Sequence, residues 1–377
     1  MEARGFAIAT VVAVAAGGAL AGCGGDDDDA PAEVCVVAPG DGPAAPTSGP
    51  LCRRLSTYRL FADVPGQVPA AGVEPFDLTT PLFSDYTDKL RFVHVPAGAA
   101  MQWHDVDSLA MPVGTILVKT FAYAVDRRQP AAGRRLLETR LLVRMDDGWK
   151  AAAYTYGDDD GDAELAIAGD LIDAEWIHDD GQVRTNRYAV PNVNQCANCH
   201  AEHDEVVGPL GPKARHWNRV QPGGSENQLA RFVALGWLAG APDAAAWPRT
   251  PVWDDDGDGT LDERARGWLD VNCAHCHNPR GAARTSGLDL TPTQTDPVQY
   301  GVCKPPVAAG AGSGGRRYSI VPGQPDESIL IYRLEATAPD VRMPELGRNL
   351  VHVESVAVLR EWVTALPGTC ATAAPAP

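Results

Sequence analysis

Alternating apolar and polar residues dominate the first half of the chain. The clearest runs are MPVGTILVKTFAY, from Met111, and RRLLETRLLVRMDDGWKAAAYTY, from Arg134. A period of two is typical of a strand with one buried face, and Asp147 and Gly148 are residue types of a tight hairpin turn. We therefore expect a mostly antiparallel β domain over residues 55–190.

The spacing of apolar residues changes to the helical period near the end of the chain. In LDERARGWLDVNCAHCH, they mark one face of a helix that runs into Cys273, and VHVESVAVLREWVTAL is a second predicted helix, with Pro367 and Gly368 as stop signals. The two apolar faces consist of Leu261, Ala265, Trp268 and Leu269, and of Val356, Leu359, Trp362, Val363 and Leu366.

Residues 1–22 have the pattern of an export signal. An apolar run from Phe6 to about Ala21 leads into LAGC, which ends at Cys23. Small residues before a cysteine are typical of a lipoprotein, in which the signal is removed and the cysteine is acylated. A retained membrane anchor is the alternative, but the run is short for a span. Residues 23–54 are rich in Asp, Pro, Gly and Ala, so we expect a flexible tether.

Composition narrows the class of partner. The 377 residues are 45% hydrophobic and 21% charged, which is ordinary for a globular protein, but the formal net charge is −17. So acidic a chain argues against binding to nucleic acid or to an anionic bilayer surface. We expect soluble partner proteins with basic docking surfaces.

The nine cysteines fall into three groups. Cys23 is the predicted lipidation site, and four cysteines belong to two CxxCH motifs. The other four are an even number in an oxidising compartment, so we expect two disulfides. Three pairings are open, and we favour Cys35 with Cys52 and Cys303 with Cys370.

The two CxxCH motifs indicate covalent haem. One consists of Cys196, Cys199 and His200, and the other of Cys273, Cys276 and His277. In a c-type haem, two thiols form thioethers with the porphyrin and the adjacent histidine binds the iron. Four cysteines could instead bind zinc, or each CxxC could be a redox dithiol. Neither alternative needs a histidine after the second cysteine, so we predict two haem c groups.

The surroundings of the second motif resemble a small class I cytochrome c domain. A helix leads into CxxCH, a methionine follows in VRMPELG, and a last helix closes the chain. The resemblance implies that the two helices pack together, that His277 is the proximal iron ligand and that Met343 is the distal ligand. Met343 is the only methionine after either motif, and a His/Met pair suits an electron-transfer haem.

The sixth ligand of the first iron stays open. No methionine lies between His200 and Met343. His216 is the nearest candidate, although a histidine without a ligand role is the simpler interpretation, and an iron with an open site could act on small molecules. The upstream alternatives are Met101, Met111 and Met145.

Three other features have ordinary structural explanations. PVGTILVKTF before a CxxCH motif resembles cytochrome P-460-like proteins, which would imply a cross-link between Lys119 and haem, but we favour a Lys119 that points to solvent, as strand lysines commonly do. The Ser-Asp pair ending at Asp85 is expected to cap backbone amides. DDDGDGTLDERA, from Asp254, starts like a calcium-binding EF-hand loop. Because its twelfth position is Ala265 instead of glutamate, we favour a solvated acidic turn over a calcium site.

Taken together, these segments resemble a family of bacterial dihaem c-type cytochrome lipoproteins. The likeness extends from about Leu55 to Trp362 and includes PFDLTTPLFSDYTDKLRFVHVPAG, PVGTILVKTF, NVNQCANCH, LDVNCAHCHNPRGAARTSGLDL, IVPGQPDESILIYRL and RMPELG. We expect an α+β fold, with the β domain leading into a first c-haem segment at 191–250 and then an all-α class I cytochrome c-like domain at 251–371.

The function expected from this resemblance is electron transfer between periplasmic or cell-surface partners. Because glycine and not aspartate follows Cys23, we expect the lipid anchor to lie in the outer membrane. The alternative is a haem enzyme whose first iron acts on peroxide or a small nitrogen compound while the second haem relays electrons. The sequence has no nucleotide-binding loop and no recognisable hydrolase triad, so we assign no catalytic residue.

Overall fold

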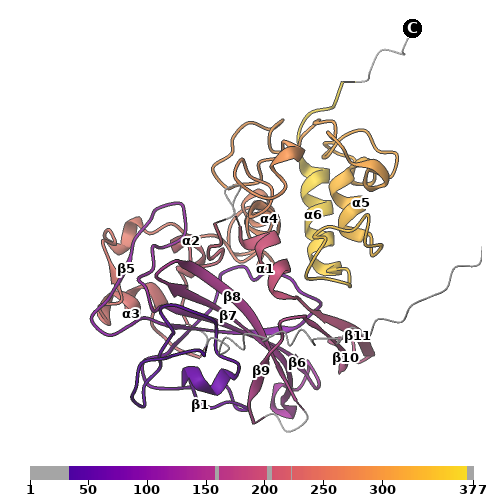
Figure 1. The fold of residues 1–377 in the computed structure, drawn as a ribbon. Coiled ribbons are helices and arrows are strands. Elements are labelled where there is room, and N and C mark those ends of the chain that lie inside the picture. Colours follow the sequence, from indigo (N-terminus) through magenta and orange to yellow (C-terminus); the bar gives the residue numbers. More distant parts are fainter. Residues whose placement is uncertain (1–33, 158–160, 202–205, 222, 372–377) are drawn as a thin grey trace, which may run out of the picture. The chain divides into compact units, whose positions relative to one another are not determined.

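Six antiparallel strands form the main sheet, in the order β3-β4-β6-β7-β8-β9 (Figure 1). The computed structural model describes residues 34–157, 161–201, 206–221 and 223–371, so the predicted signal, Cys23 and the start of the tether lie outside it. The strands are β3 (Glu74–Phe76), β4 (Asp88–His94), β6 (Ile116–Ala124), β7 (Arg134–Met145), β8 (Gly148–Tyr156) and β9 (Ala163–Leu165).

Three two-stranded sheets flank the main sheet. One of them is parallel and joins residues far apart in sequence, because Met101 lies opposite Leu238. The pairs are β1 (Phe61–Asp63) with β2 (Val68–Pro69), β10 (Asp170–Ile177) with β11 (Val183–Val190), and β5 (Met101–Gln102) with β12 (Leu238–Ala239).

Six α-helices lie in the described part of the chain. They are α1 (Val193–His200), α2 (Ala214–Trp217), α3 (Gln228–Ala234), α4 (Leu261–Leu269), α5 (Ile329–Glu335) and α6 (Val353–Ala365). A π-helical turn, Asp270–Ala274, continues α4. Short 3-10 helices cover Leu55–Tyr58, Pro130–Ala132, Ala244–Ala246, Arg284–Ser286, Gly310–Ser313 and Pro325–Glu327. None of the helices in these ranges is long and apolar enough to cross a membrane.

The main sheet is buried on both faces. Alternate residues such as Phe92 and Val118 pack with Tyr58 in one core, where the Tyr58 and Tyr154 hydroxyls are 2.8 Å apart. The residues between them, such as Val93 and Leu117, face α2 and α3 in a second core. Burial of both faces explains why the apolar runs in β6 and β7 are nearly continuous.

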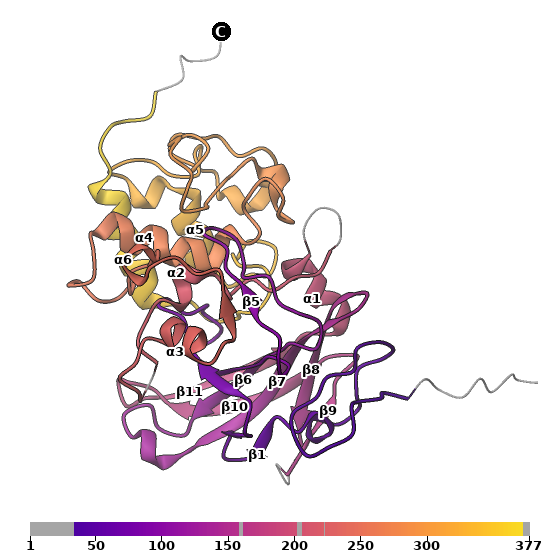
Figure 2. The ribbon, with the colours of Figure 1, turned by 90° about the vertical axis from the view of Figure 1, so that its left-hand side faces the viewer.

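The two helices predicted from apolar periodicity pack together, as Figures 1 and 2 show for α4 and α6. Their predicted faces lie in one core cluster, which confirms this part of the sequence analysis. Trp362 also donates a hydrogen bond from Nε1 to Asp262 Oδ1 at 2.8 Å. Disulfides join Cys303 to Cys370 in this region and Cys35 to Cys52 near the start of the described chain, and these are the pairs that we favoured.

The predicted fold class is wrong. The fold is mixed, with about 25% strand and 22% helix, and residues 251–371 do not form an all-α domain. Only three of the six described helices lie there, and much of the rest consists of turns and loops with isolated bridges such as Val302–Ile320. The stretch between α4 and α5 is rich in Pro and Gly, which disfavour helix interiors. This region also belongs to the same compact unit as the sheet within the described residues.

Hydrogen bonds connect residues 251–371 to the loop between β3 and β4. Asp85 accepts hydrogen bonds from the backbone amides of Asn349 and Leu350 at 2.7 and 2.8 Å, which confirms that it caps amides. Asn272, just before the second motif, accepts one from the Phe83 amide at 2.8 Å. The helical region is therefore fixed to the β-rich part by specific polar contacts instead of a linker.

Candidate functional site

The first CxxCH motif ends α1. Asn192 begins this helix with a capping box, in which its side chain accepts from the Gln195 amide and the Gln195 side chain accepts from the Asn192 amide. Cys196 and Cys199 are three residues apart, so they lie on the same side of the helix. Both are partly buried free cysteines. Helix α1 packs against β8, which places the motif beside the main sheet.

The second motif follows α4 through the π-helical turn. Thr260 and Glu263 form the capping box that begins α4. Cys273 lies within the turn, and the amides of Cys276 and His277 both donate to its carbonyl oxygen, at 3.1 and 2.9 Å. Cys273 and Cys276 are again free and partly buried. All four motif cysteines are thus free thiols, whereas Cys35, Cys52, Cys303 and Cys370 form disulfides.

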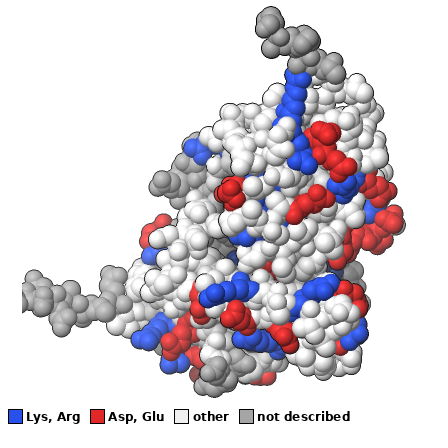
Figure 3. Space-filling view, turned by 90° about the vertical axis from the view of Figure 1, so that its right-hand side faces the viewer, with Lys and Arg blue, Asp and Glu red and all other residues white. Residues whose placement is uncertain are grey.

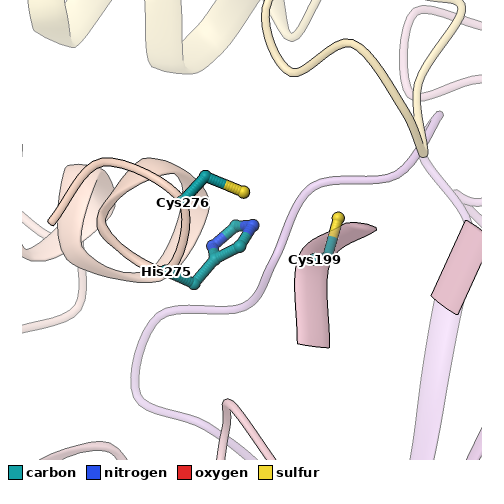
Figure 4. Close-up of side chains that lie close together, drawn as sticks. All are labelled: Cys199, His275 and Cys276. Atoms are coloured by element: carbon teal, nitrogen blue, oxygen red, sulfur yellow. The ribbon is translucent and has the colours of Figure 1, made fainter. Parts of the chain in front are cut away.

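One cysteine of each motif meets the other at a shared cluster. The Sγ atoms of Cys199 and Cys276 and a ring nitrogen of His275 lie within 4.8 Å of one another, and Figure 4 shows these side chains pointing toward a common space. The hydrogen bond with Cys276, and then that with His275, lowers the pKa of Cys199 to about 4. The same hydrogen bond with Cys199, together with burial, raises the pKa of Cys276.

Both motif histidines are arranged as metal ligands usually are. His200 Nδ1 lies 2.9 Å from the Gly208 carbonyl oxygen, and His277 Nδ1 lies 3.0 Å from Ser286 Oγ. Such contacts fix the ring and leave Nε2 for a metal. Burial lowers the pKa of each histidine to about 4, so both are neutral at pH 7. The donor set of two thiols and one neutral imidazole per motif fits a c-type haem.

Met343 lies at a small cavity beside the second motif. The Met343 amide donates to the Arg333 carbonyl at 3.0 Å, and Arg348 Nε donates to the Met343 carbonyl at 2.9 Å. The loop around Met343 is therefore held from both sides. The cavity is lined by Phe83, Trp268, Asn272, Met343, Arg348 and His352, among others. Because Asn272 directly precedes Cys273, the methionine faces the region of the second motif.

His352 shares the cavity with Met343, and the sequence analysis did not single it out. Its ring stacks on Phe83 at 4.2 Å, and its buried Nδ1 has no hydrogen-bond partner among the described residues. Burial lowers its pKa to about 3. His275 was also missed, although its place inside the second motif was a usable signal. For His352, the sequence gives no comparable signal.

His216 is engaged in a buried polar network. Its Nε2 lies 3.2 Å from Asp270 Oδ2, and its Nδ1 lies 3.3 Å from Thr250 Oγ1. Arg215 donates to both oxygens of Asp270, at 2.7 and 3.0 Å. Burial alone would raise the pKa of Asp270, but the hydrogen bonds from His216 and Arg215 hold it below its usual range. With both ring nitrogens occupied, His216 gains no support as an iron ligand.

The acidic loop before α4 is occupied by protein cations. Both carboxylate oxygens of Asp258 contact Arg249, at 2.5 and 2.6 Å, and one of them accepts from the Val252 amide. Asp256 forms an ion pair with Arg264 at 2.7 Å. These partners engage two of the three aspartates that the calcium-loop pattern would use.

The described surface shows no single-sign patch on the face in Figure 3, where acidic and basic side chains alternate. Exposed ion pairs on the described surface include Arg360 with Asp326 and with Glu335. The expectation of partners with basic surfaces therefore rests on the net charge of −17.

Comparison with known proteins identifies no relative of this chain. No protein-family model matches the chain, and neither a curated protein nor a solved structure matches it. The functional argument therefore depends on the geometry of the two motifs.

Proposed function

We propose that this protein is a dihaem c-type cytochrome that transfers electrons. One haem is held by Cys196, Cys199 and His200, and the other by Cys273, Cys276 and His277, with Met343 as the distal ligand of the second iron. Bound haem supplies one-electron redox chemistry, while the protein sets the axial ligands, the access of water and the distance between the irons. The proposal includes a lipid anchor at Cys23, in the outer membrane, and soluble partner proteins with basic surfaces.

The observation that carries this proposal is the meeting of Cys199 and Cys276, whose sulfur atoms lie within 4.8 Å of each other. Each is an attachment atom of a different motif, so the two haems would be attached at neighbouring points. Electron transfer requires redox centres that lie close together.

A zinc site is the competing use of the same cluster. Cys199, His275 and Cys276 could provide three ligands of a tetrahedral ion. That arrangement takes one cysteine from each motif and leaves Cys196 and Cys273 without a role. The haem assignment uses all four free cysteines and both following histidines, so we favour it.

The test is covalent haem content after export in a bacterial host that attaches haem c. We expect two haems per chain by pyridine haemochrome absorbance, retained on a denaturing gel. Replacing Cys196 and Cys199 with Ala should leave one haem, as should Cys273→Ala with Cys276→Ala. The control is Cys35→Ala with Cys52→Ala, which removes a disulfide outside the motifs and should keep both haems. Zinc without haem in the unmodified protein would refute the proposal.

The second candidate function is a haem enzyme acting at the first iron. The observation that favours it is the engagement of His216 by Asp270 and Thr250, which removes the nearest candidate for the sixth ligand. Carbon monoxide distinguishes the two functions. If neither reduced haem binds the gas, both irons are fully ligated and the protein is a relay. If one haem binds it while Met343 still ligates the other, the first haem is a reactive site.

A further inference from the structure

Three basic residues lie abreast in the middle of the main sheet. Arg91 of β4 is paired with Lys119 of β6, and Lys119 is paired with Arg140 of β7. Directly paired residues on neighbouring strands project to the same face, with Cβ atoms about 5 Å apart. We call these three residues the basic row. It lies on the face opposite to the core formed by Phe92 and Val118.

Nearby carboxylates form ion pairs with only two of the three residues of the basic row. Arg91 is paired with Asp77, and Arg140 is paired with Glu138. Lys119 forms no ion pair and no hydrogen bond with the described residues, and its ammonium lies 4.7 Å from the centre of the Phe121 ring. The Nη2 atom of Arg91, whose side chain is only 5% exposed, is buried without an acceptor.

Such an arrangement is unfavourable unless something else provides negative charge. Like charges directly opposite each other on a sheet are destabilising, and a buried donor without an acceptor loses the hydrogen bonds that it made to water. The prediction that the Lys119 side chain points to solvent is wrong, because this side chain is partly buried on a face of the sheet that other elements cover. Burial lowers its pKa, and the charges of Arg91 and Arg140 lower it further.

The basic row lies near the first CxxCH motif. Arg140 of β7 is paired with Ala153 of β8. Helix α1, which carries the motif, packs against β8, the strand next to Arg140.

We propose that the basic row binds a carboxylate or a similar small oxyanion beside the first CxxCH motif. This inference rests on the proposed function for one source of the anion, a propionate of the haem attached to Cys196 and Cys199. The other source is a free small anion from solution. In both cases the anion would accept hydrogen bonds from the Lys119 ammonium, which lies over the Phe121 ring, and from Arg91 Nη2, which is buried without an acceptor.

The chemistry of the row suits this ligand. Charge-assisted hydrogen bonds from Lys and Arg to carboxylate are about twice as strong as neutral ones, and they gain strength at a site with little water. An anion between Lys119 and Arg91 would also reduce the repulsion between the paired cations. The second motif has no equivalent row in the described residues around it, where Arg348 donates to backbone carbonyls instead.

The experiment uses the full chain exported with haem attached. Lys119→Met removes the cation with little change in volume, and Arg134→Met is the control, because Arg134 is exposed at the start of the same sheet's β7. Potentiometric titration of the two haems is the first measurement. Loss of a nearby cation favours the oxidised iron, so Lys119→Met should lower the midpoint potential of one haem and Arg134→Met should shift neither. Lys119→Arg should keep the potential of the unmodified protein.

Calorimetric titration with acetate distinguishes the two sources. A potential shift without acetate binding to the unmodified protein supports the propionate, and saturable acetate binding that Lys119→Met abolishes supports a free anion. The inference is overturned if Lys119→Met behaves like Arg134→Met and acetate does not bind. If the exported chain carries no haem, the proposed function fails, but acetate binding and its loss in Lys119→Met still test the row. If Lys119→Met does not fold, calorimetric titration of the unmodified chain with acetate still shows whether the basic row binds a free anion.

Discussion

Replacing Asp270 should destabilise the protein more than any replacement of a surface charge. Asp270 is buried between Arg215 and His216, and the side chains of Asp270 and Arg215 are only 2% and 10% exposed. Asp270→Asn keeps the volume but leaves the Arg215 guanidinium as a buried charge without a counter-ion. Breaking a buried ion pair from one side typically costs about 3–5 kcal/mol. We expect a loss of this size in the free energy of unfolding at pH 7.

The assay is urea unfolding of the full chain, with a matched surface control. Asp326→Asn removes the exposed partner of Arg360, whose own side chain also reaches Glu335. Exposed pairs contribute no more than about 1 kcal/mol, so this control should change stability little. A double variant, Arg215→Met with Asp270→Asn, removes both charges and should be more stable than the sum of the single changes implies. A loss below about 1 kcal/mol for Asp270→Asn would refute the reasoning.

The same network predicts the direction of a pH effect. The folded protein holds the pKa of Asp270 below its value in the unfolded chain, which is about 3.9 for an aspartate. Its contribution to stability is therefore complete above about pH 4 and is lost as the pH falls further. The difference between the unmodified protein and Asp270→Asn should thus shrink between pH 5 and pH 3. A constant difference over this interval would show that Asp270 is not held as the carboxylate.

Three further predictions address other parts of the molecule. Burial lowers the pKa of His352 to about 3, so its stabilising effect is complete above about pH 6.5 and is lost on acidification. Between pH 6.5 and pH 4.5, the free energy of unfolding in urea should therefore fall by about 2–3 kcal/mol less for His352→Phe than for the unmodified chain. Equal decreases for the two chains would contradict this. Met343→Leu should lower the potential of one haem and let its reduced iron bind carbon monoxide, whereas unchanged spectra would exclude Met343 as the distal ligand. An added Cβ at Gly169 would lie 2.6 Å from the Val190 carbonyl oxygen, whereas one at Gly98, which has a similar positive φ, meets nothing within 4 Å. Gly169→Ala should thus cost at least about 1 kcal/mol more than Gly98→Ala in thermal or urea unfolding, and equal costs would show that the loop before α1 yields.

The parts of the fold that follow local rules could be predicted from the sequence. The apolar faces of α4 and α6, including Trp268 and Trp362, follow from helical periodicity because both helices bury one side. The hairpin between β7 and β8 turns where Asp147 and Gly148 indicated it. These features depend on residues that are close together in sequence. Their burial then reinforces what the local pattern already favours.

The errors arise where long-range packing decides the structure. The resemblance to a small cytochrome domain led us to expect helices throughout 251–371, but the loops rich in Pro and Gly between α4 and α5 are held by tertiary contacts. Lys119 could not be assigned to a buried face, because β6 is covered on both sides and has no polar side to mark solvent. The cluster of Cys199, His275 and Cys276 depends on packing between segments far apart in sequence, which no local pattern reports.

The contacts that rule out a separate all-α domain are also the ones that fix the second motif next to the first. Asp270 lies three residues before Cys273 and is held by Arg215, and Asn272 accepts a hydrogen bond from the Phe83 amide. Both anchors act on the π-helical turn itself. These contacts limit the movement of the two motifs relative to each other. Because a relay needs a constant separation between its redox centres, the single compact unit is favourable for the proposed function.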